Sequence, residues 1–274
     1  MTDKLVSTDW VAEHGDDAGV RLVEVDVDTA AYGEGHIEGA VGWNWTTQLQ
    51  DQMRRDIIAK DDLEALLGES GIDNDTRIIL YGDNNNWFAA YALWVLELYG
   101  HDNAALMDGG RVKWLAEERA TTTADTSVDA ASYSAQDPDA ALRADRDEVL
   151  ASVGDEGAQM VDVRSPAEFT GEIIAPPGLP ETAQRAGHIP GAINVPWARA
   201  VNEDGTFRSV EELRELYGGA GVDEGTPTIA YCRIGERSSH TWFVLKHLMG
   251  IDDVKNYDGS WTEYGSLINV PIAR

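Results

Sequence analysis

Cys232 is the residue with the clearest chemical potential, because it is the only cysteine in the 274-residue sequence. It follows Tyr231 and a short apolar run, 228–230, that predicts a strand, and it precedes a helical pattern that runs to His247. A lone cysteine is most often a small buried apolar residue. Here the residues that follow are polar and include a glycine, which is typical of a surface turn. Cys232 is therefore either inert or a nucleophile that acts alone.

Two arginines in the same loop, Arg233 and Arg237, favour the reactive interpretation. Backbone amides at the start of a helix and two guanidinium groups would lower the pKa of the thiol and hold an oxyanion beside the sulfur. The product of such a site is a covalent adduct on Cys232. Glu236 opposes this field, so we expect it to face solvent or to pair with an arginine. The other loop residues expected to line the substrate site are Ile234, Gly235 and Ser238.

The loop has the spacing Cys-x4-Arg between Cys232 and Arg237. Cysteine phosphatases use Cys-x5-Arg, with one more residue to wrap a phosphate. The shorter loop suits a single added sulfur atom better than a phosphate. A cysteine phosphatase or an arsenate reductase remains the rival class of enzyme at this point.

Strand-like and helical patterns alternate along the chain and would position this loop. Alternation of this kind predicts an α/β fold with a mostly parallel sheet flanked by helices. Strands are predicted at 21–27, 77–81 and 104–107. Helices are predicted after an N-cap at Ser7 or Thr8, at 61–67 with Asp61 as the cap, at 87–99, and from Trp114 onward.

The same plan occurs twice in the sequence. Tyr81 and Tyr231 are separated by the same 150 positions as Asp108 and Asp258, and the motif His-Ile-x-Gly-Ala occurs at His36 and at His188. The second copy has a Pro-rich insertion from Gly171 onward that could overhang a site. Both copies keep the histidine, so we assign it to the turn and not to catalysis.

The two copies differ at the reactive loop, since Cys232 corresponds to Gly82 and Arg237 to Trp87. This asymmetry predicts one working domain and one inactive domain. We expect an inactive N-terminal domain at 1–120, a linker rich in Thr, Ser, Ala and Asp at 121–141, and a catalytic C-terminal domain at 142–274.

The whole chain resembles a tandem-domain thiosulfate sulfurtransferase of the rhodanese family. The resemblance rests on four motifs: Asp162 to Phe169, Gly187 to Ala192, the Cys232 loop, and Asn256 to Trp261. The Cys-Arg-Ile-Gly-Glu-Arg-Ser form is similar to the actinobacterial and archaeal branch. The resemblance implies two rhodanese-like domains and no metal or organic cofactor. It also implies that Cys232 takes sulfane sulfur from thiosulfate, releases sulfite, and passes the sulfur from a persulfide to cyanide or another thiophile.

Two departures from the family pattern affect the substrate cations. The animal-type enzymes have a lysine where this chain has Ile234, and a second cation where it has Glu168. We expect Arg237, with Arg233, to replace them, and Asp162 and Arg164 to support the loop. The arginines favour the thiosulfate dianion. The alternatives are 3-mercaptopyruvate as the donor, or a persulfide carrier that serves an acceptor protein.

The composition restricts the partners further. With 49 Asp and Glu against 21 Lys and Arg, the net charge of −28 repels nucleic acid and anionic membranes. The acidic residues are dispersed, as in proteins of salt-accumulating archaea, so we expect a halophilic source. The absence of a signal-peptide pattern and of a long apolar run predicts a cytoplasmic protein, either a monomer or a weak dimer. His240 and His247, seven positions apart, are expected to be ordinary helix residues and not a metal site.

Overall fold

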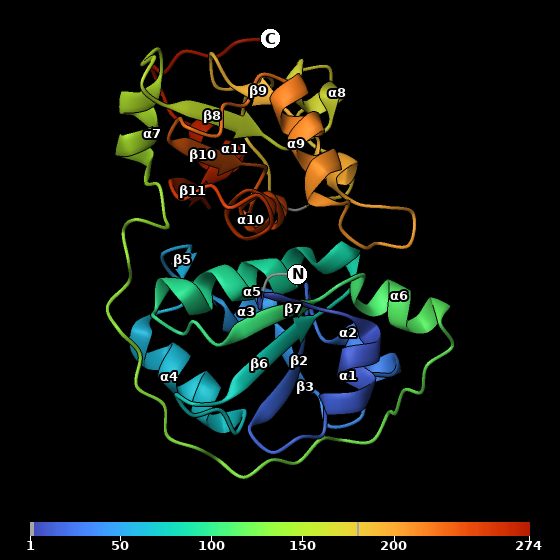
Figure 1. Cartoon of the computed structure of the whole chain (residues 1–274). Coiled ribbons are helices and arrows are strands. Elements are labelled where there is room, and N and C mark those ends of the chain that lie inside the picture. Colours follow the sequence, from blue (N-terminus) through green and yellow to red (C-terminus); the bar gives the residue numbers. More distant parts are fainter. Residues whose placement is uncertain (1–2, 180) are drawn as a thin grey trace. The chain divides into compact units, whose positions relative to one another are not determined.

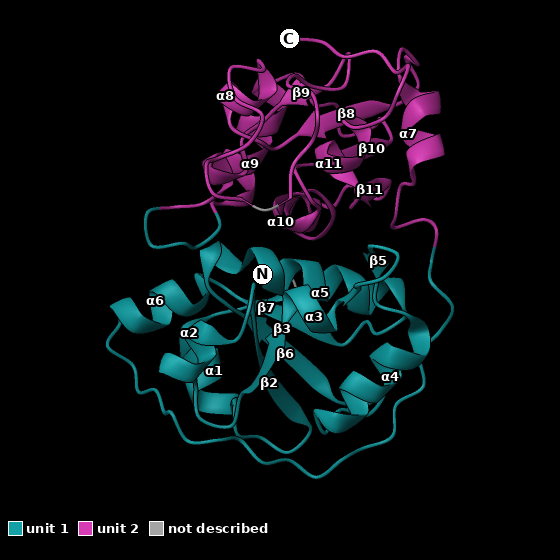
Figure 2. Cartoon of the chain, turned by 180° about the vertical axis from the view of Figure 1, so that it is seen from behind, with its two compact units in different colours: residues 1–139, 203–207 teal, residues 140–202, 208–274 magenta. Residues whose placement is uncertain are grey.

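The computed structural model describes residues 3–179 and 181–274, and the chain forms two compact units (Figures 1 and 2). Unit 1 comprises residues 1–139 and 203–207, and unit 2 comprises residues 140–202 and 208–274. Each unit has its own parallel sheet and its own set of helices. The α/β architecture with mostly parallel, helix-flanked sheets that the sequence predicted is therefore confirmed.

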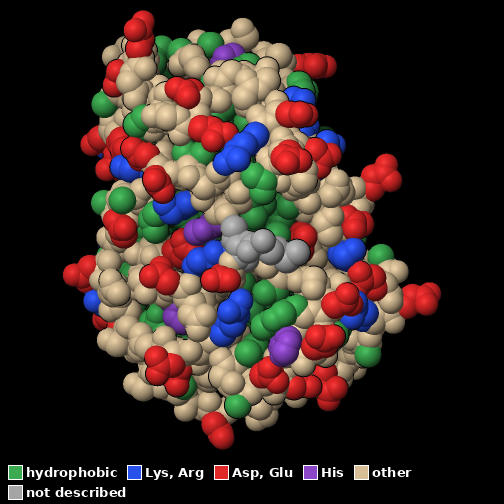
Figure 3. Space-filling model, viewed as in Figure 1, with side chains coloured by type: hydrophobic (Ala, Val, Ile, Leu, Met, Phe, Trp, Pro, Cys, Tyr) green, Lys and Arg blue, Asp and Glu red, His purple; other side chains and the backbone are tan. Residues whose placement is uncertain are grey.

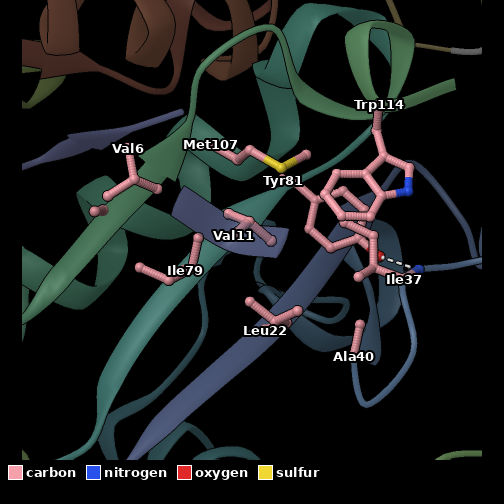
Figure 4. Close-up of a cluster of buried hydrophobic side chains, with 10 residues drawn as sticks. Val6, Val11, Leu22, Ile37, Ala40, Ile79, Tyr81, Met107 and Trp114 are labelled. Atoms are coloured by element: carbon pink, nitrogen blue, oxygen red, sulfur yellow. Dashed lines mark hydrogen bonds between the residues drawn. The ribbon is translucent and has the colours of Figure 1, made fainter. Parts of the chain in front are cut away.

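Unit 1 is built on a five-stranded parallel sheet in the order β1-β7-β6-β2-β3. One face carries the apolar cluster of Figure 4, in which Val11 from one helix and Trp114 from another pack on strand residues such as Leu22 and Ile79. The longest helix, α5, packs on the same sheet and is buried along almost its whole length. The elements are β1 Leu5–Val6, α1 Thr8–His14, β2 Val20–Asp26, α2 Ala30–Glu34, β3 Val41–Asn44, α3 Trp45–Gln48, the hairpin β4 Gln50–Asp51 and β5 Asp56–Ile57, α4 Lys60–Glu69, β6 Arg77–Tyr81, η1 Asn84–Asn86, α5 Trp87–Leu98, β7 Ala104–Met107 and α6 Gly110–Ala116.

Unit 2 is built on a four-stranded parallel sheet in the order β11-β10-β8-β9. In this register Tyr231, at the end of β10, lies beside Asp162 on one side and Tyr257 on the other. The loops that leave the three strands therefore start at the same edge of the sheet. The elements are α7 Arg146–Ser152, β8 Gln159–Asp162, α8 Pro166–Phe169, β9 Ile193–Asn194, η2 Trp197–Ala200, α9 Val210–Gly219, β10 Thr228–Tyr231, α10 Glu236–Phe243, the π-helical turn η3 Val244–Leu248, β11 Val254–Tyr257 and α11 Ser260–Tyr264.

The internal repeat extends to individual hydrogen bonds. The Tyr81 hydroxyl accepts the Ile37 amide at 3.0 Å (Figure 4), and the Tyr231 hydroxyl accepts the Ile189 amide at 3.2 Å. The histidines match as well: His36 stacks on Tyr32, and His188 stacks on Phe169. In each unit the histidine ring is thus held in the turn by its neighbours, in agreement with the structural role assigned to it.

Two local predictions need correction, and a third is confirmed with one detail added. Helix α4 has Ala59 as its N-cap, with Asp61 inside the first turn, so Asp61 is not the cap. Helix α6 begins at Gly110 and Trp114 lies near its end, because the chain enters this helix through left-handed Gly109 and Gly110. The helix after the cysteine loop reaches Phe243 as an α-helix and continues to Leu248 as a π-helical turn.

The segment predicted as a linker is irregular, and most of it is bonded to unit 1. Thr122 pairs with His36, the Ala131 amide donates to Gly68 O at 2.9 Å, and the Gln136 amide donates to Tyr99 O at 2.9 Å. Contacts of this kind explain why unit 1 extends to Asp139. Acidic side chains are spread over both units on the face shown in Figure 3, without gathering there into one patch. Within the described residues, none of the helices combines the length and apolar character that a membrane crossing needs.

Candidate active site

The cysteine loop leaves the buried strand β10 and enters α10 within four residues, Cys232 to Gly235. Gly235 makes this tight entry possible. Its φ is +103°, and a Cβ at this position would lie 2.9 Å from Asp258 Cα, so both the backbone conformation and the space require glycine. The sequence of the loop therefore fixes where the thiol and the first turn of α10 meet.

The Cys232 sulfur is fully buried among polar groups. The Gly235 amide donates to Sγ at 3.1 Å, and the Glu236 carboxylate oxygen Oε2 accepts from Sγ at 3.3 Å. The Ser260 hydroxyl lies 4.0 Å from Sγ and also accepts the Cys232 amide at 3.1 Å. One amide donor and one carboxylate acceptor thus face the same sulfur atom.

The pKa of the Cys232 thiol is raised, contrary to the lowering that the arginines suggested. Burial is the main cause, and the negative charge of Glu236 adds to it, while the charge of Arg237 and hydrogen bonds from Ser238 work in the opposite direction. The prediction counted positive residues in the loop. It could not account for complete burial of the sulfur or for a carboxylate that points at it. The resting form of Cys232 is therefore the thiol.

Both loop arginines are paired with carboxylates. Arg237 donates to the two carboxylate oxygens of Glu168 at 3.1 Å each, and its Nε lies 3.5 Å from Glu236 Oε1. Arg233 lies 3.8 Å from Glu236 and also donates to the backbone carbonyl of Glu181, in the Pro-rich insertion. Glu236 therefore pairs with arginines, which was one of its two expected placements, but it is buried and does not face solvent.

Glu168 is the member of this network whose role the sequence did not reveal. It caps α8 by accepting from the Ser165 amide at 3.1 Å, and it holds Arg237 at the same time. Burial works to raise the pKa of Glu168, but the hydrogen bonds and charge of Arg237 outweigh burial, so the pKa is lowered. The position where the family pattern has a cation thus carries an anion that positions Arg237.

The remaining loop residues serve the packing of the loop. Ile234 is buried, and the Ser238 hydroxyl donates to Asn256 Oδ1 at 2.7 Å. Asn256 also donates to the Ser239 hydroxyl at 2.9 Å, which ties the first turn of α10 to β11. Ser238 also acts on the thiol, because its hydrogen bonds favour the charged form of the Cys232 sulfur.

Asp162 and Arg164 form a buried pair at the end of β8, with Nη2 of Arg164 2.6 Å from Asp162 Oδ2. Arg164 also donates to Gly187 O at 2.8 Å, and its guanidinium lies 4.7 Å from the centre of the Trp261 ring. The pair therefore connects β8 to the turn before His188 and to α11.

Unit 1 places different chemistry at the equivalent loop. A Cβ at Gly82 would lie 2.2 Å from Val25 O, so no side chain fits there without a shift of the backbone. Asn84, Asn85 and Asn86 follow with positive φ, and the Asp83 amide donates to Asp26 Oδ1 at 2.8 Å. The loop of unit 1 has neither the thiol nor the space for one.

The two predicted helix histidines lie apart from this chemistry. His240 is buried against the Trp197 ring, and burial lowers its pKa to about 3. His247 packs on Trp242 and Phe243. Within residues 3–179 and 181–274, no three His, Cys, Asp or Glu side chains are grouped as a metal site would require.

Comparison with known proteins identifies the architecture. Residues 7–117 and residues 145–267 each match the family described as Rhodanese-like domain. The chain belongs to the rhodanese family. Cys232 thus lies in the second rhodanese domain and Gly82 at the equivalent loop of the first.

Full-length relatives of this rhodanese are found in bacteria and archaea. It is 58% identical to a Saccharopolyspora erythraea protein, over 98% of this chain and 95% of the relative. It is 55% identical to a Haloferax volcanii protein, over 99% of this chain and 96% of the relative. Both relatives are named "Putative thiosulfate sulfurtransferase". It is 51% identical to the sulfur carrier protein TtuD of Thermus thermophilus, over 98% of this chain and 96% of TtuD.

Solved structures share the tandem rhodanese fold. SseA from Escherichia coli, described as a 3-mercaptopyruvate sulfotransferase, has 26% identity and a TM-score of 0.80, over 94% of this chain and 98% of SseA. An anaerobic ergothioneine biosynthesis enzyme from Chlorobium limicola has 24% identity and a TM-score of 0.87, over 99% of this chain and 70% of that protein. The second likeness concerns the fold alone.

Ser260 is a site residue that sequence reasoning did not single out. It holds the Cys232 amide, and it has a φ of +51°, in the left-handed region that favours glycine. Its counterpart in the first rhodanese domain is Gly110, with a φ of +53°. The sequence repeat could have pointed to Ser260, because it aligns this serine with a glycine of the first copy.

Proposed function

We propose that this rhodanese is a thiosulfate sulfurtransferase whose nucleophile is Cys232. The observation that carries the proposal is the surroundings of the sulfur: the only thiol of the chain lies at the entrance to α10, in contact with a backbone amide and a carboxylate. Full-length relatives with 55–58% identity that are named for thiosulfate support the choice of donor. The second domain, 142–274, is the catalytic one in this proposal, and the first, 1–120, is inactive.

The reaction has two halves on one sulfur atom. The Cys232 sulfur attacks the sulfane sulfur of thiosulfate, the S–S bond of thiosulfate breaks, and sulfite leaves with the electron pair. A thiophile such as cyanide then attacks the outer sulfur of the persulfide and restores Cys232. The Gly235 amide, which donates to Sγ in the resting site, suits the negative charge that Sγ carries when it attacks and when the persulfide bond breaks. In this proposal Arg237 and Arg233 attract the dianion, and Ile234, Gly235, Glu236 and Ser238 shape the pocket around it.

Intact-mass spectrometry tests the proposal directly. Thiosulfate should add one sulfur atom, about 32 Da, to the protein, and cyanide should remove it with formation of thiocyanate. Cys232→Ser should take up no sulfur, and because the chain has one cysteine no other thiol can mask this result. Failure of the wild-type protein to gain the sulfur atom would refute the proposal.

Two other sulfur-transfer functions have specific support and need separate tests. The likeness to SseA favours 3-mercaptopyruvate as donor, so the rates of persulfide formation from both donors should be compared side by side. The likeness to TtuD favours a carrier that passes sulfur to an acceptor protein. A carrier would load sulfur at the same rate but react slowly with cyanide and rapidly with its acceptor protein.

We also propose that the protein acts in the cytoplasm of a salt-accumulating organism, as a monomer or a weak dimer. A free, unpaired thiol suits a reducing compartment, and the net charge of −28 suits high ionic strength. Light scattering tests the oligomeric state, and the donor comparison, repeated from low salt to molar salt, tests the salt adaptation. Loss of activity or precipitation at molar salt would contradict the salt-adapted part.

A further inference from the structure

Glu236 is placed where no simple anion-binding loop would have a carboxylate. It is 2% exposed, and its Oε2 lies 3.3 Å from the Cys232 sulfur, within hydrogen-bond distance for a thiol donor. Its other oxygen, Oε1, faces Arg237 Nε at 3.5 Å and Arg233 Nη2 at 3.8 Å. One oxygen thus faces the nucleophile, and the other is held by two cations.

The charges of the loop show why this matters for catalysis. Arg233 and Arg237 are balanced by Glu236 and Glu168, so the resting pocket has no net positive charge to offer a dianion. Burial and the charge of Glu236 also raise the pKa of the Cys232 thiol. If the thiol proton moves to Glu236, the nucleophile is no longer protonated, and the negative charge of the carboxylate is transferred to the sulfur without changing the net charge of the pocket.

We propose that Glu236 is a catalytic residue that accepts the proton of the Cys232 thiol when the donor binds and returns it when the persulfide is consumed. The inference rests on the proposed sulfurtransferase function. A side chain within hydrogen-bond distance of the proton it abstracts, in a site closed to solvent, has the geometry required of a general base.

Each step balances without an external reagent. In the first half, the S–H bond of Cys232 breaks and its proton moves to Glu236 Oε2. The sulfur lone pair forms a bond to the sulfane sulfur, and sulfite leaves with the electrons of the broken S–S bond. In the second half, cyanide takes the outer sulfur, the electron pair of the persulfide bond returns to Cys232, and Glu236 gives the proton back. The proton remains on the enzyme throughout the cycle.

Glu236 is better placed than the charged and titratable groups around it to accept the proton of the thiol. Arg233 and Arg237 remain charged and cannot accept a proton. Glu168 holds both its oxygens on Arg237, and Asp258, which packs on Gly235, is bound to Arg143 at 2.8 Å. His240, one turn further along α10, is kept neutral by burial, which lowers its pKa to about 3.

The pH dependence of sulfur loading tests the inference in the wild-type protein. The rate of persulfide formation from thiosulfate is measured by rapid quench and intact mass, and thiolate formation is measured by its ultraviolet absorbance with Cys232→Ser as the blank. If the proton passes to Glu236, the loading rate stays constant across the pH range in which the thiol is still protonated. If solvent removes the proton, the rate rises about tenfold per pH unit with the thiolate fraction, and the inference is wrong.

Variants give an independent answer. In Glu236→Gln the flat profile should become the slope of about tenfold per pH unit, and thiolate should appear at lower pH because a negative charge is gone. Glu236→Asp, which keeps an acceptor on a shorter side chain, should restore part of the flat profile. Glu211→Gln removes one charge from an exposed position of α9 and should leave the profile unchanged. A Glu236→Gln protein that keeps the wild-type pH profile would overturn the inference. If this variant does not fold, the pH profile of the wild-type protein still tests the inference.

These results are distinguishable from failure of the proposed function. If wild-type protein takes up no sulfur from thiosulfate, the sulfurtransferase proposal itself fails. If wild-type protein loads sulfur with a rate that follows the thiolate fraction, the sulfurtransferase proposal stands and only the role of Glu236 is rejected.

Discussion

Replacing Arg237 by Met tests how the active-site loop is held together. Met keeps an unbranched apolar stem and removes the guanidinium, which is 8% exposed against a Glu168 carboxylate that is 1% exposed. Removing one partner of a buried ion pair typically costs about 3–5 kcal/mol, because a charge is left buried without compensation. We expect a loss near the lower end, about 3 kcal/mol in unit 2, because Glu168 keeps its bonds to the Ser165 amide at 3.1 Å and hydroxyl at 2.9 Å.

A double-mutant cycle separates the pair from other effects of the substitution. Glu168→Gln alone leaves Arg237 beside Glu236 and should cost less, about 1–2 kcal/mol. The double variant has no uncompensated Glu168 charge, so its loss should be smaller than the sum of the two single losses by about 1–3 kcal/mol. Additive losses would show that Arg237 and Glu168 do not stabilise each other and would refute the reasoning.

Hydrogen exchange is the suitable assay because the chain has two units and a single unfolding curve would mix them. Peptides from β10 and α10 report on unit 2, and peptides from β6 and α5 provide an internal reference. Arg146→Met is a matched control, since Arg146 pairs with Asp147 on the surface and its loss should leave exchange nearly unchanged. The Arg237 effect should persist at about 1 M salt, where surface pairs are screened and buried pairs are screened much less.

The pH dependence of this effect has a defined sign. Arg237 lowers the pKa of Glu168, so the stability from the pair is fully present above the ordinary glutamate pKa and is lost as the pH falls through the lowered value. The deficit of Arg237→Met should therefore shrink in acid. A deficit that grows as the pH falls would contradict the assignment of the stabilisation to this carboxylate.

Two further predictions concern Asp26 and Ser260. Burial raises the pKa of Asp26 to about 8, so folded unit 1 retains a proton that the unfolded chain loses, and the stability of unit 1 should fall as the pH rises from about 4 to about 8. Above pH 8, Asp26→Asn should stabilise unit 1 by about 1–3 kcal/mol in hydrogen exchange. Destabilisation of unit 1 by this variant above pH 8 would contradict the prediction. Ser260→Gly should be nearly neutral for stability, because relief of the left-handed backbone strain, about 1 kcal/mol, offsets the loss of the hydrogen bond between the hydroxyl and the Cys232 amide, also about 1 kcal/mol. The variant should nevertheless load sulfur about tenfold more slowly than wild type. Equal loading rates would show that the hydroxyl does not position Cys232.

The fold was predictable because its signals are local and repeated. Apolar runs at 77–81, 104–107 and 228–230 lie in the central parallel strands, and the separation of Tyr81 from Tyr231 reveals the duplication through residue spacing alone. Helix starts were less predictable. At Asp61 a good cap sequence was overridden by a start at Lys60, and at Gly110 two left-handed glycines began the helix earlier than its apolar residues indicated.

The candidate site was predictable in its members but not in its electrostatics. Residue types located Cys232, Arg233 and Arg237 in one loop, yet they could not show which carboxylates would share that loop. Glu168 lies 69 positions before Arg237 and meets it only because β8 and β10 are neighbours in the sheet. The direction in which the Glu236 side chain points depends on α10 starting at Glu236, one residue after left-handed Gly235. The predicted lowering of the thiol pKa failed for these reasons.

The two domains show what the active loop requires beyond the fold. Asp162 at the end of β8 is neutralised by Arg164, whereas its counterpart Asp26 has Asp28 at the position that matches Arg164, and burial raises the pKa of Asp26 to about 8. The strand end can thus tolerate either an ion pair or a carboxyl group with a raised pKa. A nucleophilic sulfur beside it requires a stricter arrangement, because its negative charge must form and disappear in every turnover. Under the proposed function, the ion pairs of the two loop arginines with Glu168 and Glu236 meet this requirement in unit 2. Unit 1 has Gly82 at the position of Cys232 and Trp87 at the position of Arg237, so it has neither the thiol nor the arginine.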